Sequence, residues 1–170
     1  PHLGLAPVFF RALITTFVLW GWALMAASVW LGFGCALRPV EQVMAWLAEV
    51  LTPPVRLDEG SETTFLIVRL PKTWWLVARR QYGRMQDSLF PPFFDALRGM
   101  LGKDGSPTPV LPGKGGWYRA RFRDGIVDGL HLPYGETQSA SPDGGFHEAT
   151  EERGFVPDSV RSGGGTAKFE

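Results

Sequence analysis

The sequence has little of the chemistry that catalytic and metal sites require. It contains one cysteine, Cys35, which excludes an internal disulfide framework and a zinc site built on several cysteines. Its three histidines, His2, His131 and His147, are far apart in sequence and form no His-x-x-x-His pair. No two carboxylates are placed for acid–base catalysis. The sequence therefore predicts a protein that is not an enzyme, with no catalytic residues and no metal or cofactor of its own.

The sequence also lacks an excess of either charge. Lys and Arg total 17, and Asp and Glu total 17, so the formal net charge is zero. A nucleic-acid-binding domain usually has a basic excess, so nucleic acid is not an expected partner. The segment 102–116 is rich in glycine and contains lysine, but it lacks the Gly-Lys-Ser/Thr ending of a phosphate loop. Nucleotide binding is therefore not expected either.

The longest stretch without charge runs from Ala12 to Leu37 and contains 26 residues. As one helix it would be about 39 Å long, which exceeds the roughly 30 Å hydrocarbon core of a bilayer. The stretch therefore predicts a transmembrane helix at 12–37, preceded by an N-terminal flank at 1–11. The alternative is a helix buried inside a protein, but such helices rarely run this long without a charge.

Small residues recur along this predicted transmembrane helix at a spacing that lets a second helix approach closely. They predict a helix-docking face that consists of Ala23, Ala27, Ser28, Gly32 and Ala36. The alternative is that Gly and Ala are simply common in membrane helices. Three tryptophans in the same stretch would contact lipid, a partner helix or a pigment held by a neighbouring subunit: Trp20, Trp22 and Trp30.

Residues 38–101 are expected to form an extramembrane region of amphipathic helices with short strands. Apolar residues on one face predict a helix over 38–52, which two prolines end. β-Branched and apolar residues predict a strand at 63–70. Apolar residues at alternating spacings of three and four predict further helices over 73–89 and 91–101.

The segment 72–84, KTWWLVARRQYGR, combines aromatic and basic residues. We interpret it as an interfacial element whose tryptophans lie at headgroup depth or against a partner, and whose arginines face lipid phosphates or acidic neighbours. The predicted interfacial residues are Trp74, Trp75, Arg79, Arg80 and Arg84. A membrane-tethered nucleic-acid binder is a further hypothesis for the same arginines, which the zero net charge disfavours.

The last third of the chain divides into three parts. Residues 102–116 have the composition of a linker. Residues 117–132 alternate around an Asp-Gly turn and predict a β-hairpin, whose contact face consists of Trp117, Arg119, Arg121 and Arg123. Residues 133–170 are polar and rich in Gly, Ser and acids, so we expect an extended tail that partner subunits order.

These features together predict a mainly α membrane protein with one N-terminal transmembrane helix, amphipathic interfacial helices, a small β-hairpin and a long irregular C-terminal tail. The expected function is that of a non-catalytic accessory subunit of an energy-transducing membrane complex, respiratory or photosynthetic, which stabilises assembly. The expected partners are other membrane-protein subunits and lipid. A single-pass component of a secretion or conjugation apparatus is the alternative.

The expected location is a bacterial cytoplasmic or organellar inner membrane. A small excess of Lys and Arg over acids in 38–103 favours the cytoplasmic, matrix or stromal side for the C-terminal part.

Overall fold

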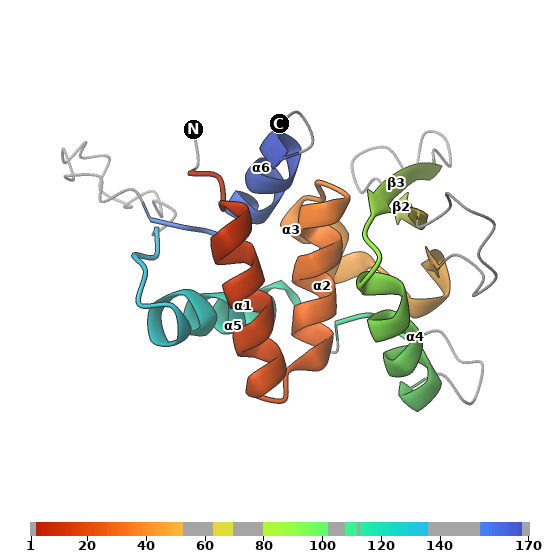
Figure 1. The fold of residues 1–170 in the computed structure, drawn as a ribbon, viewed down its shortest axis with the longest axis horizontal. Helices are drawn as coiled ribbons and strands as arrows, with labels where there is room; N and C mark the ends of the chain where they lie inside the picture. The colour runs from red at the N-terminus through yellow and green to blue at the C-terminus, as the bar shows by residue number, and fades with distance from the viewer. Residues whose placement is uncertain are drawn as a thin grey trace, which may run out of the picture.

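The computed structural model describes residues 3–52, 63–69, 80–101, 108–111, 113–135 and 154–167. Figure 1 shows α1 and α2 side by side at the centre, with α6 beside their upper ends and with α4 and a small sheet on the other side of α2. The elements in chain order are α1 (Pro7–Leu19), α2 (Ala23–Gly34), α3 (Pro39–Met44), the 3-10 turn η1 (Leu47–Glu49), β1 (Val50–Leu51), β2 (Thr63–Arg69), β3 (Arg80–Gln86), α4 (Phe90–Leu101), α5 (Gly115–Asp124), the π-helical turn η2 (Gly125–Gly129) and α6 (Asp158–Ala167).

The uncharged stretch forms two antiparallel helices, so the prediction of one transmembrane helix at 12–37 is wrong. α1 and α2 are separated by the turn Trp20–Trp22. Gly21 in this turn has a φ of +77°, a left-handed backbone conformation that ends helices and that glycine adopts readily. The N–H of Gly21 donates to the carbonyl oxygen of Val18 at 3.0 Å and closes the last turn of α1.

Burial on two sides of α2 explains why this part of the stretch carries no charge. Met25 and Val29 of α2 belong to a cluster shared with α1, whereas Ala27 and Leu31 belong to a cluster shared with the sheet and α4. A helix that is apolar all round is typical of a protein interior as well as of a membrane. Among the described helices, none is long and apolar enough to cross a bilayer. The expected location, a single-pass integral protein of an energy-transducing membrane, is therefore wrong.

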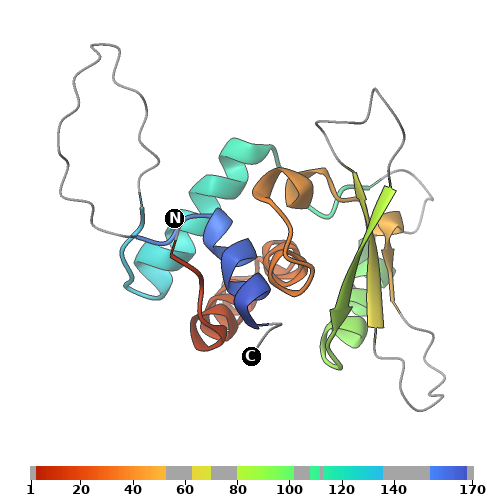
Figure 2. The same cartoon turned by 90° about the horizontal axis from the view of Figure 1, so that it is seen from above.

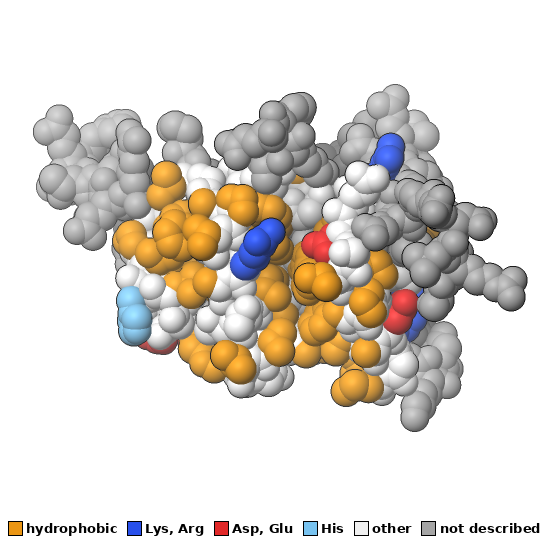
Figure 3. Space-filling model, viewed as in Figure 1, with side chains coloured by type: hydrophobic (Ala, Val, Ile, Leu, Met, Phe, Trp, Pro, Cys, Tyr) orange, Lys and Arg blue, Asp and Glu red, His pale blue; other side chains and the backbone are white. Residues whose placement is uncertain are grey.

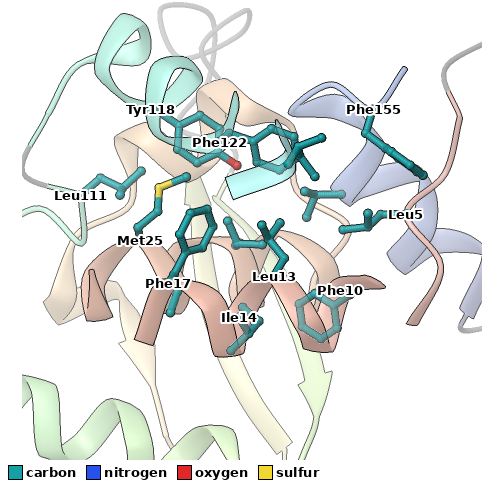
Figure 4. Packing of buried hydrophobic residues seen from close by; sticks show 14 residues of the cluster. Leu5, Phe10, Leu13, Ile14, Phe17, Met25, Leu111, Tyr118, Phe122 and Phe155 are labelled. Atoms are coloured by element: carbon teal, nitrogen blue, oxygen red, sulfur yellow. The ribbon is translucent and has the colours of Figure 1, made fainter. Parts of the chain in front are cut away.

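The larger hydrophobic cluster joins α1 and α2 to α5, η2 and α6. Tyr118 and Phe122 of α5 lie over the side of α1 that carries Leu13 and Phe17, as Figure 4 shows. The buried members of the cluster are Leu5, Phe10, Leu13, Ile14, Phe17, Met25, Ala26, Val29, Leu111, Tyr118, Phe122, Ile126, Phe155 and Val160. Each fully buried large side chain contributes about 1.5–3 kcal/mol, so this cluster is a principal source of stability.

Residues 115–129 are helical, so the prediction of a β-hairpin at 117–132 is wrong. α5 continues directly into η2 at the Asp-Gly pair that was expected to form the hairpin turn. Tyr118, Phe122 and Ile126 are spaced by four residues, lie on one helical face and are fully buried. The same apolar positions also fit a period of two, which is why the sequence pattern alone favoured a strand.

A buried hydrogen bond connects α5 to α3. The hydroxyl of Tyr118 donates to Oε1 of Gln42 at 2.6 Å, and Nε2 of Gln42 donates to the carbonyl oxygen of Leu37 at 3.3 Å. Both side chains are buried, and this burial raises the pKa of Tyr118. Since buried polar groups are costly without partners, this pair fixes how α5 docks on α3.

The three strands form an antiparallel sheet in the order β1-β2-β3, with Val50 opposite Leu66 and Leu66 opposite Gly83. β2 confirms the strand predicted at 63–70, and α4 confirms the helix predicted at 91–101. The helix predicted over 73–89 is wrong where β3 replaces it, and residues 70–79 lie outside the described part of the chain.

The helix predicted over 38–52 is shorter than expected, because α3 ends at Met44. The backbone after Met44 is extended, and the N–H of Val110 donates to the carbonyl oxygen of Ala45 at 2.9 Å. The N–H of Leu47 donates to the carbonyl oxygen of Thr108 in the same way, also at 2.9 Å. Hydrogen bonds to a distant segment therefore replace those of a longer helix.

The C-terminal segment packs on the chain's own helices, so the prediction of an irregular tail is wrong over α6. Figure 2 shows α6 lying across the upper ends of α1 and α2. Gly163 lies against the backbone of Leu5, and Gly164 lies against the carbonyl of Phe33. A Cβ atom at either glycine would overlap these backbone atoms, which explains a glycine run inside a helix.

Candidate functional site

A cleft with a volume of about 740 Å³ opens between the α1–α2 hairpin, β3 and α6, and we call it the aromatic cleft. Its apolar lining comes mainly from Phe10, Trp30 and Phe33, and its charged lining comes from Arg11, Arg84 and Asp87. The volume lies within the range of about 300–1,000 Å³ that is typical of small-molecule sites.

The three aromatic rings are held by contacts from different elements. Phe10 of α1 stacks on Phe33 of α2, with ring centroids 4.0 Å apart and planes 9° apart. Trp30 contacts Phe90 and Phe93 of α4, with centroid distances of 5.4 and 5.6 Å. The aromatic lining is therefore fixed before any ligand arrives.

Asp87 connects Trp30 to the start of α4 through hydrogen bonds. Its Oδ2 accepts a hydrogen bond from Nε1 of Trp30 at 2.8 Å. Its Oδ1 accepts from the N–H groups of Leu89 at 2.9 Å and Phe90 at 3.4 Å, at the start of α4. Backbone N–H groups at a helix start stabilise a negative charge, so these hydrogen bonds hold the carboxylate of Asp87 in place.

Arg11 and Arg84 supply positive charge at the edge of the cleft. Both side chains are exposed, Arg11 on α1 and Arg84 on β3. Arg84 makes an interaction of its own, whereas no ion pair among the described residues involves Arg11. The guanidinium of Arg11 is therefore available to an anion.

A second feature is a group of exposed apolar side chains at the turn of the hairpin and at the end of α4. Their exposed fractions are 44 % for Val18, 80 % for Leu19, 39 % for Trp20, 72 % for Met100 and 41 % for Leu101. We call these five residues the apolar end. The turn and the end of α4 both lie at the lower edge of the molecule in Figure 1, and Figure 3 shows hydrophobic side chains along this edge.

Aromatic rings and one arginine surround the hairpin turn. Trp20 and Trp22 make an edge contact, with ring centroids 5.1 Å apart. The guanidinium of Arg121 lies 4.5 Å from the ring centroid of Trp22 and 5.6 Å from that of Trp117. Arg121 therefore lies beside the tryptophans next to the apolar end. Side chains with an apolar part and a charged tip are suited to the boundary between an apolar and an aqueous phase.

The residues of the predicted helix-docking face lie within this chain's own fold. Ala27, Ser28 and Gly32 are buried, and Gly32 lies against the side chain of Gln42. Ala23 and Ala36 are half-buried on the same helix and just after it. At Gly32, the small residue therefore lets α3 of the same chain approach α2 closely.

The predicted interfacial residues are only partly described. Trp74, Trp75 and Arg79 lie outside the described residues, and Arg80 is described only as part of the backbone of β3. Arg84 is exposed and lines the aromatic cleft.

The predicted hairpin contact face is dispersed around a helix. Arg119 is exposed, whereas Trp117 and Arg121 contact one another beside the hairpin turn. Arg123 lies over Tyr134, with its guanidinium 5.9 Å from the ring centroid. Burial raises the pKa of Tyr134, and the nearby Arg119 and Arg123 oppose this rise. The four residues therefore do not form one basic surface.

Sequence reasoning missed Phe10, Arg11 and Phe33 as site residues. Phe10 and Arg11 belong to the predicted N-terminal flank at 1–11, and Phe33 belongs to the predicted transmembrane helix at 12–37. The missed signal was the Trp-Gly-Trp turn, because only a hairpin there brings Phe10 and Phe33 together. No protein-family model, no curated protein and no solved structure matches this chain, so its function has to be inferred from this geometry.

Proposed function

We propose that this protein is a non-catalytic accessory subunit that attaches to a membrane surface and to a multi-subunit complex there. The observation that supports the proposal is the apolar end, in which Leu19 and Met100 expose 80 % and 72 % of their surface to solvent. Grouped exposure of large apolar side chains indicates an interaction site. Burial of the exposed parts of the five side chains is worth about 5 kcal/mol in total.

The local chemistry of α1 favours a lipid surface as the partner of the apolar end. The hydroxyl groups of Thr15 and Thr16 donate to the carbonyl oxygens of Arg11 and Ala12, each at 2.9 Å. These hydroxyls are satisfied within the helix, so they need no water when the surroundings become apolar. The last half of α1 can therefore enter a lipid interface without leaving these two hydroxyl groups unpaired.

The position of charge along α1 sets a depth for this attachment. Arg11 precedes Leu19 by eight residues, which corresponds to about 12 Å along the helix axis. Interfacial elements bury their apolar side about 5–10 Å into the boundary between headgroups and acyl chains. Insertion of the apolar end to this depth places Arg11 at the level of the lipid phosphates and leaves the rest of the fold in water.

Vesicle flotation tests the attachment. The protein is mixed with phosphatidylcholine vesicles, with and without phosphatidylglycerol, and the fraction that floats is measured. Wild-type protein should float, more strongly with the anionic lipid, and Leu19→Glu and Met100→Glu should each reduce the floating fraction severalfold. Val40→Glu is the matched control, because Val40 is 48 % exposed on α3, which comes after the opposite end of α2.

Failure of the wild-type protein to float, or equal flotation of Leu19→Glu and wild type, would refute attachment through the apolar end. Circular dichroism of each variant confirms that it is folded. The accessory role is tested separately by purifying the tagged protein from its native membranes. Copurification of cofactor-bearing subunits supports an energy-transducing complex, and copurification of secretion or conjugation components supports the alternative.

A further inference from the structure

The aromatic cleft is separate from the apolar end. It is lined by the first half of α1 and the second half of α2, whereas the apolar end includes the turn that joins the other ends of these helices. A function of the cleft would therefore be independent of membrane attachment through the apolar end.

The end of β3 presents its edge to the cleft. Residues 84–87 are four consecutive residues, and all of them line the cleft. The first three belong to β3, which is an edge strand of the sheet, and Asp87 follows it directly. The buried side chain of Met85 packs against Gly34, and both residues line the cleft.

One wall of the cleft is formed where α6 packs closely on the end of α2. Gly164 of α6 lines the cleft and touches the carbonyl of Phe33. The half-buried Trp30 and Phe33 line the cleft together with the buried Phe10. This surface is suited to an extended apolar group rather than to a fully polar ligand.

The charged residues at the edge of the cleft favour an anionic ligand. Two arginines, Arg11 and Arg84, line it against one acid, Asp87, whose carboxylate accepts hydrogen bonds from Trp30 and from the start of α4. Guanidinium groups bind phosphate and carboxylate through paired N–H donors. An anionic head next to an apolar body thus matches both halves of the lining.

We propose that the aromatic cleft binds an anionic amphiphile, a molecule with one phosphate or carboxylate head held by Arg11 and Arg84 and an apolar chain laid against Phe10, Trp30 and Phe33. The ligand is either a free amphiphile or a lipid drawn from a bilayer, which share this chemistry. The proposal does not depend on the proposed membrane attachment.

Titration calorimetry with dodecyl phosphate below its micelle concentration tests the proposal on the full chain. Dodecyltrimethylammonium is the probe of opposite charge, and inorganic phosphate is the probe without a chain. We expect dodecyl phosphate to bind, and both other probes to bind at least roughly tenfold more weakly, because each satisfies only half of the lining. Equal affinity for either of them would overturn the proposal.

Arginine variants locate the binding. Arg11→Gln and Arg84→Gln should each weaken dodecyl phosphate binding roughly three- to tenfold. Arg119→Gln, which removes an exposed arginine of α5 outside the cleft, should leave it unchanged. Unchanged binding in both cleft variants, or an equal loss in Arg119→Gln, would overturn the proposal. Because all three side chains are exposed, the variants should fold like the wild type.

The Leu19→Glu variant separates the cleft from the apolar end and one ligand source from the other. It should lose vesicle flotation and retain dodecyl phosphate binding. Loss of probe binding in this variant would place the amphiphile at the apolar end and overturn the cleft proposal, even if membrane attachment stands. Release of bound lipid from protein purified out of anionic vesicles, detected by mass spectrometry, identifies the bilayer as the source. Its absence, with retained probe binding, identifies a free amphiphile.

Discussion

Replacement of Gly164 with alanine should detach α6 from the rest of the fold. Gly164 touches the carbonyl of Phe33, so an added Cβ atom has to displace backbone rather than a flexible side chain. Overpacking of a tight site typically costs about 1–3 kcal/mol, and rigid backbone places this site at the upper end. The gain in helix propensity on replacing glycine with alanine, about 1 kcal/mol, offsets part of that cost.

The net expectation for Gly164→Ala is a loss of about 1–2 kcal/mol in the free energy of unfolding. The neighbouring Gly165 provides a matched control, because a Cβ atom built there meets nothing within 4 Å. Gly165→Ala should therefore raise stability by up to about 1 kcal/mol, through propensity alone. The two substitutions have the same chemistry on adjacent residues and should change stability in opposite directions.

Urea unfolding followed by circular dichroism measures both variants. Limited proteolysis at the C-terminal segment adds a local measurement, since a detached α6 is cleaved faster than a docked one. If Gly164→Ala and Gly165→Ala change stability equally, or if both raise it, the close contact between α6 and α2 is not present in solution.

Three further substitutions test other parts of the fold. Gly21→Ala should cost about 1–2 kcal/mol in thermal unfolding, since alanine is strained at positive φ, and no loss would argue against the hairpin turn. Tyr118→Phe should cost about 1–3 kcal/mol in urea unfolding, because it leaves Gln42 Oε1 buried without its donor. Since burial raises the pKa of Tyr118, wild-type stability should fall as the pH rises above the ordinary tyrosine pKa of 10.0, and a smaller fall in Tyr118→Phe checks this assignment. Asp87→Ala should cost about 1–2 kcal/mol at the start of α4 and shift the fluorescence of Trp30, whereas an unchanged spectrum would contradict their hydrogen bond.

The parts of the fold that the sequence predicted correctly are those with an unambiguous local pattern. β2 has consecutive β-branched and apolar residues, and α4 has an apolar face that no competing period explains. The pattern in α5 was ambiguous, because its apolar residues fit both a strand and a helix. Burial of Tyr118, Phe122 and Ile126 on one face decides between them, and that burial depends on α1.

The prediction of a membrane span failed for a related reason. Absence of charge is compatible with lipid and with the interior of a protein, so it does not distinguish the two. The single local sign of a break was Gly21 between two tryptophans, and its positive φ is a property of the folded backbone. The aromatic cleft could not be predicted either, because Arg11 and Arg84 come together only after the hairpin and the sheet have formed.

The hairpin turn has a consequence for how this chain can be placed at a surface. A continuous helix over the same residues would put the segments before and after it on opposite sides of any layer it entered. Because the chain reverses at Gly21, the start of α1 and the end of α2 leave in the same direction, away from the apolar end (Figure 1). Under the proposed attachment of the apolar end to a membrane, a reagent confined to one compartment should therefore reach both Leu3 and the loop after α2.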